Sequence, residues 1–245
     1  MQKLNIFATA EETRIAVAKV VFAEIQTLLS TQPSVHIALT GGSDGAAITE
    51  FLDRELRSIS AFPHSIHLWW SDERFVELDD SQRNDVELVH LQKSHGSNPA
   101  LVIHRAPAPS QVADISQAVQ IWRQEFDEAC IDIAVVGVGP DGHIASLFPG
   151  LWNTSETADF LAVTNSPKPP ARRLTMSFGL LSRTKHIIIA GTGSVKAPIF
   201  GAAVSKDFEL PVTHLLNLPQ AHLYLDTSAA ANIDNTSAHL TTEKS

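Results

Sequence analysis

The sequence predicts an α/β fold, in which a doubly wound, mostly parallel sheet is flanked by helices within a single domain. Three observations support this prediction. Apolar runs of strand length alternate with helical patterns along most of the 245 residues. The run 131–136 is nearly all apolar, as expected for a parallel strand with helices on both faces. No stretch rich in Pro, Gly or Ser is long enough to divide the chain into two domains.

Each predicted strand is a short apolar run, and a helical pattern follows most of them. In chain order the strands are residues 4–7, 35–39, 66–70, 101–103, 131–136, 185–190 and 223–225. The helices are expected to begin at capping residues or after glycine turns. They run from Thr9 or Glu11 to residue 29, from the turn 41–43 to 56, over 85–92, over 110–129 with Ser110 as the cap, and over 193–204.

Residues 1–226 form the predicted domain, and residues 227–245, rich in Ser, Thr, Ala and Asn, are expected to be a mobile tail. The N-terminus lacks the pattern of a signal peptide, and no apolar run is long enough to span a membrane. The only cysteine, Cys130, precedes an apolar run and is expected to be a buried structural thiol. A chain with one cysteine fits the reducing cytoplasm.

The formal net charge is −9. A nucleic-acid partner requires a basic face, so this charge argues against one. An anionic ligand would need a local cluster of cations within an acidic protein. Parallel sheets of this kind bind ligands beyond the carboxyl ends of their strands, so the residues that follow each strand are the candidates for a site.

The turn after the strand 35–39 has the sequence Thr-Gly-Gly-Ser-Asp-Gly. Gly42 lets the backbone approach a ligand, the following helix directs N–H groups at an anion, and Ser43 adds a hydroxyl donor. This pattern indicates anion binding, with Ser43 as a helix cap the alternative. The turn also matches the G-x-S-x-G pattern of a serine nucleophile, but this strand is only the second in the chain, which disfavours that interpretation.

Charged side chains follow the strand 66–70. Asp72, Glu73 and Arg74 stand at its carboxyl end, where a guanidinium can present a planar fork to a phosphate. A surface ion-pair cluster is the alternative. The charges further along, at 79–80 and 83–85, are interpreted as a solvated loop and the start of a helix.

The turn after the strand 131–136 has the sequence Gly-Val-Gly-Pro-Asp-Gly-His. It contains G-x-G-x-x-G, but its late position in the chain and Pro140 disfavour a dinucleotide site. Asp141 stands two residues before His143, so its carboxylate can fix the imidazole tautomer. It is also expected to hold the pKa of His143 near neutrality, somewhat above the reference value.

Further cations lie near glycines and prolines late in the sequence. Lys196 follows two glycines by one helical turn and can reach a monophosphate, although the Walker spacing expected for a triphosphate is absent. A proline-rich segment carries Lys168, Arg172 and Arg173. Arg173 adjoins the apolar run 174–177, so we expect Arg173 to be held in place.

Together these segments resemble the 6-phosphogluconolactonase family over about residues 5–226. The motifs run in family order at 40–43, 70–74, 137–143 with 145–150, 166–170 with 173–175, and 193–196. The block 137–150 and the Pro-Lys-Pro-Pro segment are the most specific of them. Two positions depart from the family: Asp44-Gly45 replaces the usual Thr-Pro, where an acid is expected to repel a phosphate, and Glu77 stands where proline is common.

The resemblance implies hydrolysis of 6-phosphoglucono-δ-lactone to 6-phosphogluconate in the oxidative pentose phosphate pathway, with no cofactor and no metal. It implies that His143 deprotonates the attacking water and that Asp141 orients His143. The phosphate would be held by Arg74, Arg173, Lys196, Ser43 and Gly42. Asp72 would contact the sugar hydroxyls or the cationic cluster.

Two other functions are alternatives. A glucosamine-6-phosphate deaminase would share the fold and the Asp-Gly-His turn, but the ending Phe-Pro-Gly at 148–150 and the Pro-Lys-Pro-Pro segment favour the lactonase. A non-catalytic sugar-phosphate sensor domain would usually follow a basic helix-turn-helix, whereas here the predicted fold begins at residue 4. The expected partner is a small-molecule substrate, with no nucleic acid and no membrane. The sequence does not determine the oligomeric state.

Overall fold

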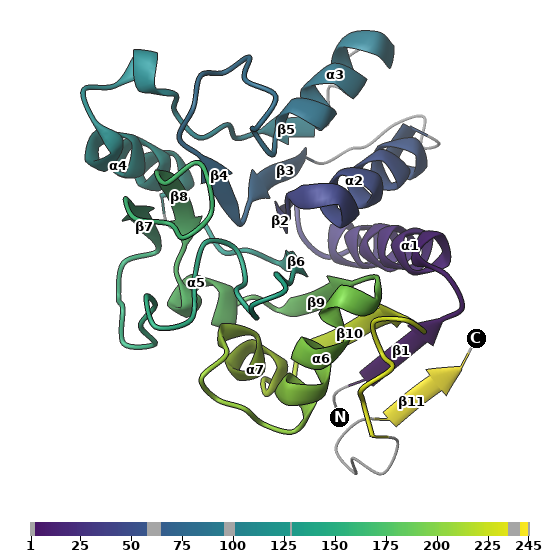
Figure 1. Ribbon diagram of the computed structural model, residues 1–245. Coiled ribbons are helices and arrows are strands. Elements are labelled where there is room, and N and C mark those ends of the chain that lie inside the picture. The colour runs from purple at the N-terminus through teal and green to yellow at the C-terminus, as the bar shows by residue number, and fades with distance from the viewer. Residues whose placement is uncertain (1–2, 58–64, 96–100, 128, 235–240, 245) are drawn as a thin grey trace.

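The structure, a computed structural model, describes residues 3–57, 65–95, 101–127, 129–234 and 241–244. In these residues, eight strands form one sheet (Figure 1). They are β1 (Lys3–Phe7), β2 (Ser34–Leu39), β3 (Ser65–Trp70), β5 (Leu101–Ile103), β6 (Ile133–Gly137), β9 (His186–Gly191), β10 (Ala221–Asp226) and β11 (Thr241–Lys244). Their spatial order is β11-β1-β10-β9-β6-β2-β3-β5, and the neighbouring strands are parallel. The predicted parallel sheet is confirmed.

Helices cover both faces of this sheet (Figure 1). They are α1 (Ala10–Leu29), α2 (Gly42–Arg57), α3 (Val86–His95), α4 (Ile115–Phe126), α5 (Phe178–Ser182), α6 (Ala197–Val204) and α7 (Pro211–Leu216). α1 and α2 pack together on one face, while α4, α5, α6 and α7 belong to the other. This is the predicted doubly wound arrangement. Within the described ranges, no helix has the length and apolar character needed to cross a membrane.

The strands feed two hydrophobic cores, because successive side chains point to opposite faces. On β2, Val35, Ile37 and Leu39 pack in the core beneath α1 and α2. Ala38 on the same strand and Trp69 on β3 pack in the core beneath the other helices. All five side chains are almost fully buried. Burial on both faces explains why these strands read as continuous apolar runs.

A second, smaller sheet was not predicted. It consists of β4 (Asp72–Arg74), β8 (Arg173–Met176) and β7 (Phe160–Val163), which pair antiparallel in the order β4-β8-β7. β4 is three residues long and carries only charged side chains, so it lacks the alternation by which a half-buried strand is recognised. Its partner lies about a hundred residues away, and no local pattern encodes that pairing.

The helix before β6 starts later than predicted. α4 begins at Ile115 instead of Ser110, because the Asp114 carboxylate caps it by accepting a hydrogen bond from Gln117 N (2.9 Å). Pro109–Gln111 forms a separate single turn of 3-10 helix.

The same helix ends at Phe126, three residues before the predicted end. Asp127 takes a φ of 48°, a left-handed conformation that stops the helix. Cys130 is exposed, so the prediction of a buried thiol was wrong. Burial starts one residue later, at Ile131, which is 2% exposed.

Packed structure continues beyond the predicted domain end at residue 226. The Asp226 carboxylate accepts a hydrogen bond from Ala229 N (2.7 Å), and Ala229 and Ala230 are buried in the core. β11 then pairs with β1 at the edge of the sheet. Residues 235–240 and 245 of the predicted tail lie outside the described residues, and the mobility of the tail stays a prediction.

Three histidine rings stack on one another and against Trp69. His36 on β2 and His67 on β3 are neighbours in register, with ring centroids 4.3 Å apart. His104, just after β5, stacks on His67 at 5.1 Å and on Trp69 at 3.8 Å. His67 Nδ1 lies 2.8 Å from His104 Nε2, and His104 Nδ1 lies 2.6 Å from Glu125 Oε1. The stack joins three strands to α4.

This stack predicts loss of stability in mild acid. Burial, followed by the nearby His67, lowers the pKa of His36 from 6.5 to about 4, although Asp132 opposes this; burial also lowers the pKa of His67. Since the unfolded chain protonates these rings more readily than the folded one, the free energy of unfolding should fall as pH drops from about 6.5 towards 4.

Urea unfolding midpoints measured across this pH window would test the prediction. The variant His36→Asn has no titrating ring at this position and should lose less stability over the same window. An equal acid loss in both chains would show that other groups are responsible.

Candidate active site

The order of the strands in the sheet determines where the site lies. After β2 the chain adds β3 and β5 on one side, then returns to form β6 on the other side of β2, followed by β9 and β10. The loops that leave the carboxyl ends of β2 and β6 therefore diverge, which opens a crevice between them. One hydrogen bond still joins the two loops, as Gly137 N donates to Thr40 Oγ1 (3.1 Å).

A cleft of about 200 Å³ lies at this crevice. Its walls include residues 40–44 after β2 and 137–139 at the carboxyl end of β6. Five polar side chains complete them: Asp72, Arg74, His143, Arg173 and Lys196. Gly42 and Ser43 belong to the first loop, so the structure brings every predicted site residue except Asp141 to the wall of one cleft.

The turn after β6 holds the imidazole of His143 at the cleft. Asp141 Oδ1 lies 2.5 Å from His143 Nδ1, and the ring centroid of Phe148 lies 4.7 Å from that of His143. A Cβ at position 139 would lie 1.9 Å from His143 Cε1, so the ring can occupy this place only because Gly139 has no side chain. Asp141 thus lies behind the imidazole and fixes its orientation.

Burial lowers the pKa of His143 below its ordinary value of 6.5. The hydrogen bond and charge of Asp141 oppose this effect, and the charge of Lys168 adds to it. The net direction is downward, so the expectation of a somewhat raised pKa was wrong; the His143 side chain is only 15% exposed, and desolvation outweighs the carboxylate. His143 is therefore neutral at pH 7, and a proton on Nδ1 shared with Asp141 leaves Nε2 as the acceptor.

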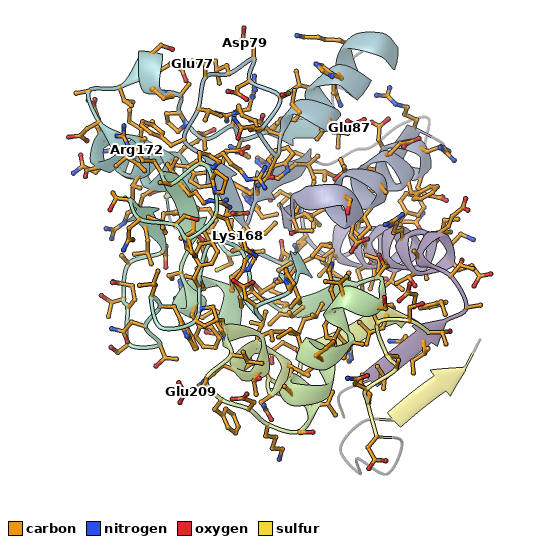
Figure 2. The ribbon with its side chains drawn as sticks, viewed as in Figure 1. Glu77, Asp79, Glu87, Lys168, Arg172 and Glu209 are labelled. Atoms are coloured by element: carbon orange, nitrogen blue, oxygen red, sulfur yellow. The ribbon has the colours of Figure 1, made fainter. Side chains whose placement is uncertain are left out.

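Lys168 also lies beside His143 and Asp141. The sequence left open whether Lys168 contacts a ligand. Its Nζ lies 3.0 Å from Asp141 Oδ1 and 3.2 Å from His143 Nδ1. Figure 2 shows Lys168 near the middle of the view and Arg172 towards its edge. The Arg172 guanidinium lies 4.7 Å from the ring of Phe75. Of these two cations, Lys168 is the one beside the imidazole.

The small sheet brings three charged side chains to the cleft. Arg74 on β4 is paired in register with Arg173 on β8. Asp72 Oδ2 accepts a hydrogen bond from Ser146 Oγ (2.6 Å) and lies 3.6 Å from Arg173 NH1. Arg74 NH1 donates to the Gln82 carbonyl (2.5 Å). The pairing of β4 with β8 therefore sets the spacing of the two guanidinium groups.

Arg173 also holds the segment that carries Lys168. Its Nε donates to the carbonyl of Pro170 (3.2 Å), and its NH2 donates to the carbonyls of Pro169 (3.1 Å) and Lys168 (3.2 Å). The Arg173 side chain is 5% exposed, and burial lowers its pKa. Arg173 is thus held in place, and it fixes the backbone from which Lys168 reaches the imidazole.

Lys196 ends the 3-10 turn η2 (Ser194–Lys196), which follows β9. Its Nζ donates to Asp44 Oδ2 (2.8 Å). Asp44 also accepts hydrogen bonds from Arg14 Nε (2.9 Å) and Thr192 Oγ1 (2.7 Å). The acid that departs from the family pattern therefore contacts two cations, of which Lys196 lines the cleft.

The glycine turn after β2 exposes Ser43 at the cleft. α2 begins at Gly42, so Ser43 lies in the first helical turn and is not the residue before the helix that the capping alternative required. Gly42 has a φ of 75°, which favours glycine. A Cβ at Gly45 would lie 2.1 Å from the Thr40 carbonyl oxygen, so this backbone path also requires glycine at 45.

Beneath the turn lies a buried network that the sequence did not predict. The sequence predicted that the charges of Arg83 and Asp85 are solvated, which was wrong. Both side chains are fully buried and are joined by two hydrogen bonds (2.8 and 3.0 Å). Burial raises the pKa of Glu73 to about 7, although Arg83 opposes this. Asn84 between them donates to the Asp72 carbonyl (2.8 Å) and packs where a Cβ of Gly41 would otherwise lie. The network therefore supports the cleft from below.

A family model described as glucosamine-6-phosphate isomerases/6-phosphogluconolactonase matches residues 8–224. The chain belongs to this family. The 6-phosphogluconolactonase of Mycobacterium leprae is 29% identical to it over 243 residues, which cover 94% of this chain and 98% of the relative. The human 6-phosphogluconolactonase is 28% identical over 251 residues, covering 93% and 92%. The resemblance that the motifs indicated is confirmed at the level of the family.

Solved structures in this family share the fold. The 6-phosphogluconolactonase of Trypanosoma brucei superposes with a TM-score of 0.80 at 21% identity, covering 96% of this chain and 99% of that one. A monomeric glucosamine-6-phosphate deaminase superposes with a TM-score of 0.73 at 19% identity, covering 94% and 100%. Because both enzymes have this fold, the fold alone does not choose between their reactions.

Two residues in or beside the cleft of this family member were missed or misinterpreted from the sequence. Lys168 was visible as a cation in the Pro-Lys-Pro-Pro segment, but nothing local showed that it reaches His143. Asp44 was read as a source of repulsion because its cationic partners lie on other elements. Within the described part of the chain, no cluster of three or more His, Cys, Asp or Glu side chains is arranged to hold a metal ion.

The titration of His143 should respond in opposite directions to its two charged neighbours. Asp141→Asn removes the charge that favours the imidazolium, so the pKa of His143 should fall. Lys168→Met removes the charge that opposes it, so this pKa should rise. NMR titration of the His143 ring in the three chains measures both shifts. Shifts of the same sign in the two variants would contradict this account of the site.

Proposed function

We propose that the protein hydrolyses 6-phosphoglucono-δ-lactone to 6-phosphogluconate. The observation that carries this proposal is the pairing of His143 with Asp141 in the same cleft as Arg74, Arg173 and Lys196. This is a base beside a group of cations, as a phosphorylated ester substrate requires. The full-length relatives named 6-phosphogluconolactonase support the assignment.

In the proposed mechanism, His143 Nε2 removes a proton from a water molecule as the water oxygen attacks C1 of the lactone. The C1–ring oxygen bond then breaks, and imidazolium His143 returns the proton to the leaving oxygen. The carboxylic acid formed loses its remaining proton to solvent. Asp141 keeps Nδ1 as the donor and stabilises the transient imidazolium. General acid–base catalysis of this kind contributes about 10²–10⁴-fold.

The depressed pKa of His143 suits both halves of this cycle. A neutral ring is available as the base at pH 7, and its imidazolium form releases a proton readily to the leaving oxygen. No metal or cofactor is needed, because a δ-lactone is a reactive ester.

The phosphate is proposed to lie among Arg74, Arg173 and Lys196, with Ser43 and the backbone of Gly42 as further donors. Guanidinium and ammonium groups form charge-assisted hydrogen bonds with phosphate oxygens. Asp72 lines the cleft beside Arg173, where it can accept a hydrogen bond from a sugar hydroxyl. These contacts would place C1 near His143.

The proposal includes a cellular place and a class of partner. The substrate is a small phosphorylated lactone. We assign the protein to the cytoplasm, where reducing conditions suit a chain with one cysteine.

His143→Asn should lose roughly 10²-fold or more in turnover, while still binding 6-phosphogluconate, because the amide keeps a polar group but cannot act as the base. Asp141→Asn should lose less, since the base remains but is less well oriented. A pH-stat assay with EDTA present measures the rate after subtraction of spontaneous opening. A glucosamine-6-phosphate control tests the deaminase alternative.

His186→Asn is the matched control, because His186 lies on β9 beside Glu24 and away from the cleft. It should keep full turnover. If His143→Asn were equally active, the base would be another group, and Asp72 would be the next candidate.

Lys196→Ala should weaken binding of the phosphorylated substrate. One charge-assisted contact is worth about 1.5–3 kcal/mol, which corresponds to roughly ten- to a hundredfold in affinity. Inorganic phosphate should compete with the substrate, and unphosphorylated gluconolactone should be a poor substrate. KM values for both lactones measure these effects.

Lys185→Ala is the control for this experiment, since Lys185 pairs with Asp132 at the amino end of β9 and is half exposed. Its KM should match that of the unaltered chain. Arg173→Ala is a less direct probe, because it also releases the carbonyls of the segment that carries Lys168. Equal rates on the two lactones would remove the case for a phosphate site.

A further inference from the structure

We propose that Asp44 is a positioning residue of the phosphate site, which holds Lys196 at the cleft instead of repelling the phosphate. The inference rests on the proposed function and deepens it. From the sequence alone, an acid at this position was expected to repel a phosphate.

Both oxygens of the Asp44 carboxylate accept hydrogen bonds. Oδ2 accepts from Lys196 Nζ (2.8 Å) and from Thr192 N (3.3 Å). Oδ1 accepts from Arg14 Nε (2.9 Å) and from Thr192 Oγ1 (2.7 Å). The Asp44 side chain is 7% exposed, against 20% for Lys196 and 26% for Arg14. A buried carboxylate that accepts this many hydrogen bonds is held in one position, and it holds the two cations beside it.

These bonds join segments that are far apart in the sequence. Asp44 lies in the first turn of α2, Arg14 lies on α1, and Thr192 and Lys196 lie in the loop after β9. The two turns that flank the proposed phosphate position are therefore held together through one carboxylate. Loss of that carboxylate would release the loop after β9 from the turn after β2.

The net charge of this cluster indicates whether Asp44 favours or opposes phosphate binding. With Asp44 present, two cations and one anion give this cluster a net charge of +1. Without it, Arg14 and Lys196 would repel each other. Arg14 is the more exposed of the two and would turn towards solvent, which would again leave about +1 at the cleft. The net charge available to a phosphate is thus similar in both cases, and what changes is the freedom of Lys196.

Lys196 keeps donors for a ligand while it is held. An ammonium has three N–H groups, and one of them reaches Asp44. The two others can face a phosphate oxygen. A lysine that is already ordered loses less conformational entropy when the ligand binds, because its long side chain samples many rotamers when free. The pKa of Asp44 agrees with a charged pair, since Lys196, Thr192 and Arg14 lower it despite burial.

The test is Asp44→Asn, which keeps the size of the side chain and removes its charge. We expect KM for the phosphorylated lactone to rise roughly three- to tenfold, with a much smaller change in kcat, because Lys196 is disordered and His143 is not touched. Isothermal titration with inorganic phosphate should show the same loss of affinity. Lys196→Ala should cost less in the Asp44→Asn background than in the unaltered chain, since the two residues act as a unit.

The matched control is Asp53→Asn. Asp53 is another buried acid of α2, and it pairs with Arg57 away from the cleft. Its KM should be unchanged. If repulsion were the role of Asp44, Asp44→Asn would instead lower KM, and an unchanged or lowered KM would overturn the proposal.

Two further outcomes are separated by design. If the unaltered chain did not open the lactone, the proposed function would fail, while phosphate titration would still measure the effect of Asp44. If Asp44→Asn did not fold, Asp44→Glu would decide, because it keeps the charge but displaces the carboxylate. Positioning predicts a raised KM for Asp44→Glu, whereas repulsion predicts no change.

Discussion

The parallel pairing of β2 with β6 is the contact on which the rest of the structure depends. Ile37 and Ala38 face Ile133 and Ala134 across it, and the sheet grows in opposite directions from this pair. Two consequences follow. Helices are placed on both faces, which gives the two cores, and the loops after the two strands separate, which gives the cleft. The small antiparallel sheet then adds Asp72, Arg74 and Arg173 to a crevice that already exists.

In and beside the cleft, acids and cations occur as pairs. Asp44 contacts Lys196, Asp72 lies near Arg173, and Asp141 contacts Lys168. In the proposed function, this arrangement lets a chain of net charge −9 present an ordered basic site to the substrate phosphate. Each acid fixes a flexible cation in one place, and the cation neutralises the acid that would otherwise repel the ligand. The local order of the charges, and not the total, then determines what the cleft binds.

Burial has the same effect on two histidines with different surroundings. Desolvation lowers the pKa of both His36 and His143, so both rings are neutral at pH 7. His36 lies among other aromatic rings and accepts a hydrogen bond from Trp69 Nε1 (3.2 Å), a structural role. His143 has a carboxylate on Nδ1 and lines the cleft. Burial keeps both rings neutral, but of the two only His143 is among the residues that line the cleft.

The sequence by itself determined the parallel α/β fold, the positions of its main strands along the chain and the turns that carry Gly42, His143 and Lys196. These features depend on local patterns: buried strands are continuous apolar runs, and ligand turns need glycine. Only the tertiary structure decided the pairing of β4 with β8, the burial of Arg83 and Asp85, the contact of Lys168 with His143 and the partners of Asp44. It also decided the direction of the His143 pKa, since desolvation depends on every group packed around the ring. The physical reason is the same throughout. The contacts and the pKa of a charged group depend on its neighbours in space, whereas a sequence shows only its neighbours along the chain.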